Sequence, residues 1–358
     1  MLRIIILFNL ILVFSFSSGQ TDYQPYSFFI AGHTSGNSGL YRPFKLKFRY
    51  IQDRHEIKFG ILTGDIVPPN PISQDWDRVD AAIKFLGLPI YFAVGNHDME
   101  NRPLFESRYG DTYYHFIYQN DLFIVLDPNL DHWNISMTQL ENLEKLIESK
   151  HQLVDNIFVF FHQLLWWEKD NRYSGITPNS FAGRATTINF WSQVEPLFHQ
   201  LTNNVVLCAG DMGAGNWGSD IMFDNYHNIT FIASGMGGGT GDNFVVINVD
   251  QEKNIQYDLI CLNDTNLNCF GALTDYDMSP ITTYKIYPNP ATKSITVELD
   301  ETSHATVQIV SLNGQVLYEK QSKNEYKQCI DVSNLNQGVY LIRTTSQVNI
   351  STAKLIIQ

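Results

Sequence analysis

The sequence has few basic residues, and they form no cluster. Lys and Arg together number 24, against 37 Asp and Glu, which gives a formal net charge of -13. No run of Lys or Arg interrupts this acidic composition. Because a nucleic acid or an anionic membrane would be repelled by such a chain, the composition argues against either as a partner.

Long apolar runs are missing beyond the N-terminal segment, so no transmembrane anchor is predicted. In that segment Arg3 precedes the mostly apolar stretch Ile4 to Phe16, and small residues follow at 17–19. This order is typical of a secretory signal peptide. The apolar stretch, of about a dozen residues, is too short to span a bilayer comfortably. We therefore expect residues 1–20 to be a signal peptide and the protein to be exported.

Cysteine is scarce, at four residues. Cys261 and Cys269 flank a polar turn and could form a disulfide in an exported chain. Cys208 lies in an apolar, strand-like run and Cys329 lies in a different predicted domain. We expect these last two to stay reduced.

Residues 21–262 contain short apolar runs that alternate with helix-like stretches. Trp76, Val79, Ile83 and Leu86 keep a helical period, and Ser136 to Gln139 resembles a capping box at the start of a helix. A hairpin is predicted around Asn120-Asp121. This alternation predicts a layered α/β fold. The predicted strands are residues 26–31, 57–63, 88–94, 113–118, 122–126, 157–161, 205–209, 229–233 and 244–249.

The pattern changes near residue 263. Residues 263–283 are polar and rich in turn residues, which is typical of a linker. Residues 284–358 then show closely spaced strands, with a turn at Asn313-Gly314 and no helix, and predict a small all-β sandwich. Its predicted strands are residues 294–299, 306–311, 315–320, 339–344 and 353–357.

Polar side chains follow the predicted strands of the larger domain where each strand ends. Ligands in open α/β folds gather beyond the carboxyl ends of strands, so these positions could converge. Each alone is more often a structural residue or a turn, but imidazole and oxygen ligands repeated in this way suit a divalent metal. A glycine directly before several of them allows close approach of the backbone. The positions are His33, Asp65, Asn96, His97, Asp98, His162 and Asp211.

These stretches resemble the calcineurin-like metallophosphoesterase family over about residues 26–262. The motifs are Gly64-Asp65, Gly95-Asn96-His97-Asp98, His162, and Gly210-Asp211 where the family usually has Gly-His-x-His. The resemblance implies a layered β-sandwich flanked by helices and hydrolysis of phosphoesters by metal-bound hydroxide. It implies one or two divalent metal ions, with Mn, Fe and Zn as candidates.

Two departures from the family pattern alter the expected metal site. Ala31 stands where the first motif has aspartate, and Gly213 stands where the last motif has its second histidine. Carried over position by position, the resemblance leaves only His33 and Asp65 as ligands of one metal ion. That ion is then bound weakly, absent, or held with the help of other groups. The other metal keeps a full set of ligands, namely Asp65, Asn96, His162 and Asp211.

The resemblance also assigns roles to the neighbours of Asn96. His97 would protonate the leaving oxygen or stabilise the phosphoryl charge, and Asp98 would orient its imidazole. The alternative is that the pair forms a hydrogen-bonded turn beside Asn96.

For substrate binding, Trp166, Trp167 and Trp217 follow metal-ligand candidates and could stack on a sugar or base, or else belong to the core or rim. The glycine-rich segment 235–239 could approach substrate, but no helix signal follows it, so we do not predict a nucleotide-phosphate cradle.

Residues 284–358 resemble the type A sorting domain of type IX secretion. The motifs are Tyr287-Pro288-Asn289-Pro290, then Leu312 to Val316, Leu335 to Ile342 and a Lys354 to Ile357 finish. The resemblance implies recognition by the outer-membrane secretion machinery. The alternative is a permanent carbohydrate-binding or spacer domain.

The sequence thus predicts a secreted, metal-dependent phosphoesterase with an altered metal site. The alternative function is a non-catalytic surface protein that keeps the fold and binds metal. Retention of His97 and Asp98, which a scaffold does not need, favours the enzyme.

Overall fold

The computed structural model describes most of the chain from residue 23 onward. The expected signal peptide, Trp217, Cys269, the Asn313-Gly314 turn and most of the expected linker lie outside the described residues. Within the described part, no helix is long and apolar enough to cross a membrane. The described residues are 23–37, 39–213, 215, 219–263, 272–273, 285–298, 305–311, 316–321, 327–346 and 350–358.

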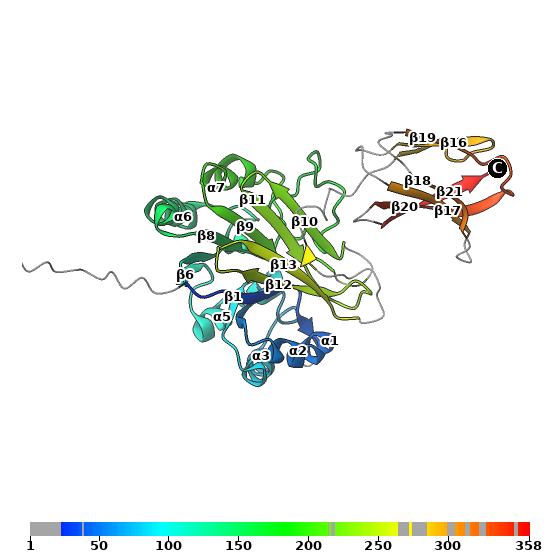
Figure 1. Cartoon of the computed structure of the whole chain (residues 1–358). Coiled ribbons are helices and arrows are strands. Elements are labelled where there is room, and N and C mark those ends of the chain that lie inside the picture. The colour runs from blue at the N-terminus through cyan, green and yellow to red at the C-terminus, as the bar shows by residue number, and fades with distance from the viewer. Residues whose placement is uncertain are drawn as a thin grey trace, which may run out of the picture.

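Two six-stranded sheets form the framework of the larger domain (Figure 1). The first sheet has the order β14 (Ala272–Leu273), β13 (Ile255–Cys261), β12 (Asn243–Val249), β1 (Tyr26–Ala31), β4 (Ile57–Thr63) and β5 (Ile90–Ala93). The second has the order β10 (Ile221–Tyr226), β11 (Ile229–Ser234), β9 (Asn204–Ala209), β8 (Asn156–Phe160), β7 (Asp121–Val125) and β6 (Tyr114–Tyr118).

Helices cover the outer face of each sheet, which makes four layers. On the first sheet pack α1 (Arg42–Leu46), α2 (Phe48–Asp53), α3 (Ser73–Leu86), α4 (Asn96–Met99) and α5 (Arg102–Tyr109). On the second pack α6 (Met137–Lys150), the π-helix η3 (Phe190–Val194) and α7 (Glu195–His199). Shorter elements are β2 (Ser35–Gly36), β3 (Gly39–Leu40), and the 3-10 turns η1 (Pro128–Leu130) and η2 (His151–Leu153).

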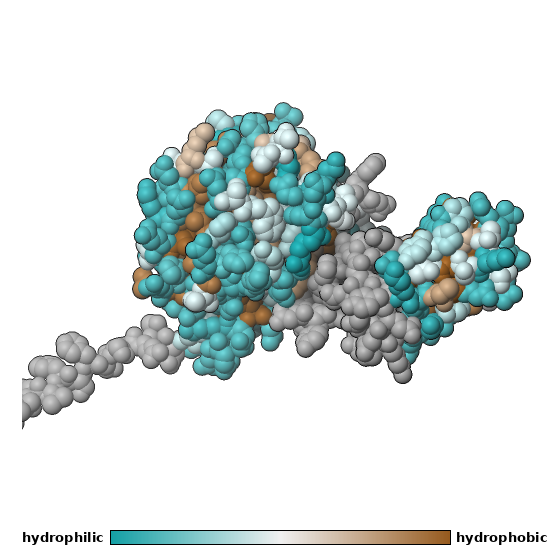
Figure 2. Space-filling view, turned by 90° about the horizontal axis from the view of Figure 1, so that it is seen from above, coloured by the Kyte–Doolittle hydropathy of each residue, from teal (hydrophilic) through white to brown (hydrophobic). Residues whose placement is uncertain are grey.

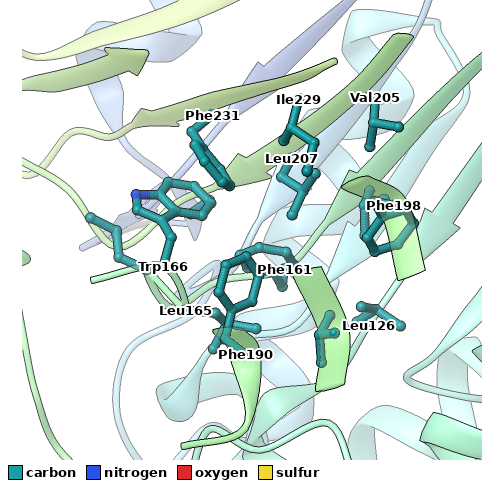
Figure 3. Close-up of a cluster of buried hydrophobic side chains, with 14 of the residues drawn as sticks. Leu126, Phe161, Leu165, Trp166, Phe190, Phe198, Val205, Leu207, Ile229 and Phe231 are labelled. Carbon is teal, nitrogen blue, oxygen red and sulfur yellow. The ribbon is translucent and has the colours of Figure 1, made fainter. Parts of the chain in front are cut away.

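Alternating side chains of the central strands fill separate cores. In β1, Phe28 and Ile30 belong to the cluster between the two sheets, whereas Phe29 and Ala31 face the helices of the first sheet. All four are fully buried. This is why β1 appears in the sequence as a continuous apolar run, because both faces of the strand are covered. The core between the second sheet and its helices is shown in Figure 3.

Parallel pairing brings the carboxyl ends of the central strands to one edge. In the first sheet β1 pairs in parallel with β4, and β4 with β5. In the second sheet β7, β8 and β9 are parallel neighbours. The turns that follow these strands therefore gather at the same end of the sandwich, which is where we predict the functional residues.

The structure confirms the layered α/β fold and most of the predicted strands. β1 and β4 have the predicted bounds, and the hairpin of β6 and β7 forms as expected. The sequence patterns missed β10 and β13, which carry polar side chains at several positions.

The predicted capping box at the start of α6 is wrong. Ser136 is the N-cap but makes no side-chain capping bond. Its hydroxyl donates to Asp131 (2.6 Å) instead, and the Gln139 side chain bonds the backbone of Asp127.

The C-terminal segment forms two sheets around a core of its own. One contains β15 (Lys285–Tyr287), β16 (Ser294–Glu298) and β19 (Lys327–Asp331). The other has the order β18 (Val316–Gln321), β17 (Ala305–Ser311), β20 (Gly338–Ser346) and β21 (Ile350–Ile357). Ile295, Val307, Ile342 and Leu355 lie in the core. The predicted all-β sandwich is confirmed, and the two short strands β15 and β19 were missed.

The face drawn in Figure 2 is mostly hydrophilic where residues are described, with small apolar areas. Cys261 is disulfide-bonded, and its expected partner Cys269 lies outside the described residues. Cys208 and Cys329 are free, as expected, with Cys208 buried.

Candidate metal centre

The turns after β1 and β4 hold His33 and Asp65 in an uncommon backbone conformation. His33 has φ 54° and Asp65 has φ 48°, in the left-handed region that disfavours residues with a side chain. Backbone hydrogen bonds join the two turns, from His33 N–H to the Gly64 carbonyl (2.9 Å) and from Ser35 N–H to the Asp65 carbonyl (3.0 Å). Strain of this kind costs on the order of 1–3 kcal/mol per residue and tends to occur at functional sites.

The Asp65 carboxylate is the point on which the histidines converge. Its Oδ2 lies 3.6 Å from His33 Nε2, 3.5 Å from His97 Nδ1 and 3.5 Å from His162 Nε2. His162 Nε2 lies in turn 3.6 Å from Asp211 Oδ1. His33, Asp65 and His97 follow strands of the first sheet, whereas His162 and Asp211 follow strands of the second. The structure thus brings these five predicted residues together across the two sheets.

Asn96 adjoins this group as the first residue of α4 and is half-buried. The next backbone N–H, that of His97, donates to Asp65 Oδ1 (3.0 Å). This bond fixes the start of α4 against Asp65.

Two glycines permit this convergence. A Cβ on Gly64 would overlap the imidazole of His162, and a Cβ on Gly95 would overlap the carboxylate of Asp65. Gly64 also has φ 87°, which suits glycine. The expectation that glycine allows close approach of the backbone is confirmed at both positions.

The side chains differ in burial, and we call the buried ones the floor of the site and the partly exposed ones its mouth. The side chains of Asp65, His162 and Asp211 are at most 1% exposed. Those of His33 and His97 are 15% and 27% exposed. A molecule from solvent would therefore meet the two exposed imidazoles first.

Several floor atoms lack hydrogen-bond partners. His162 donates from Nδ1 to the Thr63 carbonyl (2.8 Å), which leaves Nε2 directed toward Asp65 and Asp211. Among the described residues, His162 Nε2, His97 Nδ1 and both Asp211 carboxylate oxygens are buried without a hydrogen bond of acceptable geometry. Buried polar atoms without partners are costly, and an imidazole fixed through its other nitrogen is typical of a metal ligand.

The spacing also suits a cation, although no complete site is preformed. Ligand atoms about 2.1 Å from one tetrahedral ion lie roughly 3.4 Å apart, close to the separations found here. Within the described residues, no three His, Cys, Asp or Glu side chains already stand in the arrangement of a bound metal. The donor types and the unpartnered atoms fit a divalent ion, and the final approach of the ligands would accompany its binding.

Burial and mutual charge shift the pKa values of the floor residues. Burial acts against the charged form of Asp65, but the charges of His162, His97 and His33 outweigh it and lower the Asp65 pKa. Burial likewise lowers the pKa of His162, and Asp65 with Asp211 overcomes this and raises it to about 10. Burial raises the pKa of Asp211 to about 6, with His162 opposing. A cation that binds here competes with the His162 proton.

The glycine-rich segment 235–239 holds His33 from one side. Its Nδ1 lies 2.8 Å from the carbonyl oxygen of Met236, in the glycine-rich segment 235–239. The Asp242 carboxylate accepts the N–H groups of Gly237, Gly238 and Gly239 (3.0–3.1 Å). Because a side chain of the protein already occupies these amides, the segment supports His33 and offers no anion cradle.

Asp98 does not orient the His97 ring in the expected way. The carboxylate is fully buried and accepts the N–H groups of Gly95 (2.8 Å), Ile66 (2.9 Å) and Val67 (3.1 Å). These contacts join the turn after β5 to the turn after β4. Burial, together with the Asp65 charge, raises the pKa of Asp98 to about 7. The geometry gives Asp98 the role of the predicted alternative, a hydrogen-bonded turn beside Asn96.

The predictions for the three candidate substrate-binding tryptophans have different outcomes. Trp166 is fully buried in the core on the second sheet, as Figure 3 shows, so the prediction that it contacts substrate is wrong. Trp217 lies outside the described residues. Trp167 is half-buried and packs on Phe181, with ring centroids 4.4 Å apart, and Arg184 lies over its ring.

Sequence analysis missed Asn179 and Phe181, which come from the segment between β8 and η3. Asn179 lies beside His33, and Phe181 is 43% exposed two residues later. No motif marks either residue in the sequence. The only available signal was that the segment follows His162 and lacks strong periodicity, which is typical of a loop that shapes a site.

Two family models match separate parts of the chain. A model of the calcineurin-like phosphoesterase family matches residues 33–187, and a model of the secretion system C-terminal sorting domain matches residues 285–358. The curated ulvan lyase NLR42 of Nonlabens ulvanivorans is 32% identical over 82 residues, which is 23% of this chain and 15% of the lyase. The chain therefore spans a small part of that relative.

Two solved structures are similar at low identity. GAP50, the anchor in the inner membrane complex of Plasmodium, aligns with a TM-score of 0.46 at 13% identity, over 70% of this chain and 88% of that one. The purple acid phosphatase PPD1 from yellow lupin seeds aligns with a TM-score of 0.48 at 16% identity, over 70% of this chain and 53% of that one.

Proposed function

Since the chain carries a calcineurin-like phosphoesterase domain and a type IX secretion sorting domain, we propose that it hydrolyses phosphoesters outside the cell. The sorting domain indicates export to the cell surface or beyond. The phosphoesterase domain supports hydrolysis of phosphoesters in general.

One observation carries the proposal. Among the described residues, Nε2 of buried His162 and both oxygens of buried Asp211 make no hydrogen bond of acceptable geometry. His162 Nε2 lies between the two carboxylates, 3.5 Å from Asp65 Oδ2 and 3.6 Å from Asp211 Oδ1. A purely structural core would have paired these atoms, because each unpaired buried polar group costs about 1–3 kcal/mol. The arrangement is explained if a cation belongs between them.

We assign Asp65, Asn96, His162 and Asp211 as the ligands of that cation. A divalent ion supplies Lewis-acid activation of water and of the phosphoryl oxygens when bound. Asp65 contributes the central charge, and the Thr63 carbonyl fixes His162 with Nε2 toward the floor. Burial of these residues excludes water from all but the mouth of the site.

His97 is the residue we assign to proton transfer. It stands at the mouth, 27% exposed, with Nδ1 toward Asp65 and its backbone N–H bonded to the same carboxylate. Nε2 is then the atom that holds a proton for the leaving oxygen. Such a positioned acid contributes roughly 10²–10⁴-fold to a rate.

Metal analysis combined with turnover tests the proposal. The purified chain should contain a divalent ion and hydrolyse a generic aryl phosphomonoester or phosphodiester. Asp65→Asn and His162→Ala should lose both metal and activity. Asp53→Asn, an exposed carboxylate on α2 with a side chain 58% exposed, is the matched control and should lose neither.

The same experiment separates the alternatives. Normal turnover by Asp65→Asn and His162→Ala would refute the proposed site. Bound metal without turnover of either substrate class would identify the non-catalytic binding protein instead.

A further inference from the structure

Asn179 reaches the candidate metal centre from the long segment between β8 and η3. Its backbone N–H donates to the Asp211 carbonyl (2.9 Å). Its side-chain Nδ2 lies 3.0 Å from His33 Nε2. Asn179 thus connects a residue that follows the first sheet with one that follows the second.

This contact engages the nitrogen through which His33 would bind a metal. Its other nitrogen, Nδ1, faces the Met236 carbonyl, which can only accept, so Nδ1 carries the proton. Nε2 therefore accepts, and the Asn179 amide donates to it. An imidazole nitrogen that accepts a hydrogen bond has no second lone pair for a cation.

His162 offers the opposite arrangement within the same site. Its Nδ1 is also bound to a carbonyl, that of Thr63, but its Nε2 has no hydrogen-bond partner among the described residues. Both histidines bond a carbonyl through Nδ1, and they differ in what faces Nε2. One is open to a cation, and the other is closed by an amide.

The neighbouring positions on the His33 side cannot supply replacement ligands. Ala31 is fully buried on the helix-covered face of β1 and has no donor atom. Gly213 has φ 81°, and a Cβ there would press on the backbone of Gly235 and Met236. A larger side chain at 213 would be strained.

We propose that the Asn179 amide takes the place of a second cation and holds His33 by a hydrogen bond, so that the site binds one divalent ion. This inference rests on the proposed function, which supplies the first ion. His33 is then a positioning residue at the mouth of the site, and Asn179 is a fixed part of the protein that binds no metal.

Mn²⁺ binding to the full chain tests the inference without reference to activity. The chelator-treated protein is titrated with Mn²⁺, the bound metal is counted by mass spectrometry, and electron paramagnetic resonance is recorded. We expect one ion per chain with the hyperfine pattern of isolated Mn²⁺. Two ions per chain with an exchange-coupled spectrum would overturn the inference and leave the proposed function standing.

Variants separate ligands from positioning residues. His33→Ala and Asn179→Ala should each keep the ion, with affinity reduced by at most roughly tenfold, whereas His162→Ala should lose more than roughly a hundredfold. Loss of the ion in Asn179→Ala would show that its amide oxygen is a ligand and would overturn the inference. Absence of any bound ion in the unmodified chain would refute the proposed function as well.

Discussion

The buried carboxylate of Asp98 illustrates how one residue of a motif acquires its role from its neighbours. It follows His97 directly, yet its oxygens accept backbone N–H groups from the turns after β4 and β5. Asp98 therefore places Asp65 and Asn96 by holding the two turns together. Asp98 therefore affects the proposed hydrolysis only through the positions of these two residues.

Replacing Asp98 with asparagine should lower stability more than it alters the chemistry. One acceptor oxygen becomes a donor that faces a backbone N–H, which costs about 1–3 kcal/mol in the free energy of unfolding. Urea unfolding of the purified variant measures this loss. His97→Gln is the comparison, because it should reduce kcat and leave the unfolding free energy nearly unchanged. Full stability of Asp98→Asn with a kcat as low as that of His97→Gln would contradict this assignment.

The charge of His162 makes the stability of the metal-free protein depend on pH. Burial opposes the charge, but Asp65 and Asp211 raise the pKa of His162 from 6.5 to about 10. Because the pKa in the folded state is higher than in the unfolded state, protonation stabilises the fold. This contribution is complete below pH 6.5 and is lost as pH rises toward about 10.

In chelator-treated protein, the stability advantage of the native chain over His162→Gln should shrink as pH rises from about 7 to 10. Denaturant unfolding of both proteins at several pH values measures the difference. A difference that stays constant over this range would show that His162 is neutral in the metal-free site.

At the scale of elements, the segment between β8 and η3 supplies the wall beside the mouth. Phe181 lies against Trp167 and Trp133, with ring centroids 4.4 Å and 6.2 Å away. Arg184 lies within 5.8 Å of both tryptophan rings and pairs with Glu168 (2.8 Å). These contacts hold Phe181 in place while 43% of it remains exposed. The wall is therefore a partly exposed aromatic surface two residues along the chain from Asn179.

Phe181→Ala should raise the KM for an aryl phosphoester by roughly three- to tenfold with little change in kcat, because an aromatic contact is worth about 0.5–1.5 kcal/mol. Steady-state kinetics with aryl and alkyl substrates measures the effect, which should be confined to the aryl ester. Phe85→Ala on α3 removes another exposed phenylalanine, 72% exposed, and should change neither constant. An unchanged aryl KM in Phe181→Ala would exclude this wall from substrate binding.

At the scale of the whole molecule, residues 285–358, which match the sorting-domain model, follow the part of the chain that matches the phosphoesterase model. Within the sorting domain, the Asn289 side chain donates to the Lys354 carbonyl (2.8 Å) and accepts from Ile356 N–H (2.9 Å). The first sequence motif of this domain is thereby attached to its last strand. The two motifs are far apart along the chain but form one structural unit.

Deleting residues 285–358 should leave the protein inside the cell envelope of a host with type IX secretion. Immunoblots of cell and medium fractions measure this, and an unrelated exported protein fused to residues 285–358 serves as the reciprocal test. Appearance of the truncated chain in the medium at the normal level would show that export does not depend on this domain.

Elements buried on both faces were predictable, whereas partly polar elements were not. β1 and β4 have the predicted bounds because most of their side chains are apolar and buried. β10 and β13 alternate with polar residues, and their strand conformation depends on pairing with β11 and β12. The Ser136 capping box failed because a tertiary contact with Asp131 captured the hydroxyl.

The sequence by itself determined the layered α/β architecture, the C-terminal sandwich and the residues that meet at Asp65. Apolar runs of strand length, and the glycines directly before His33, Asp65, Asn96 and Asp211, are local features that can be read from the sequence. Only the tertiary structure decided which nitrogen of each histidine is open, that Trp166 belongs to the core, and that Asn179 faces His33. These facts depend on contacts between distant segments, whose partners no local pattern specifies.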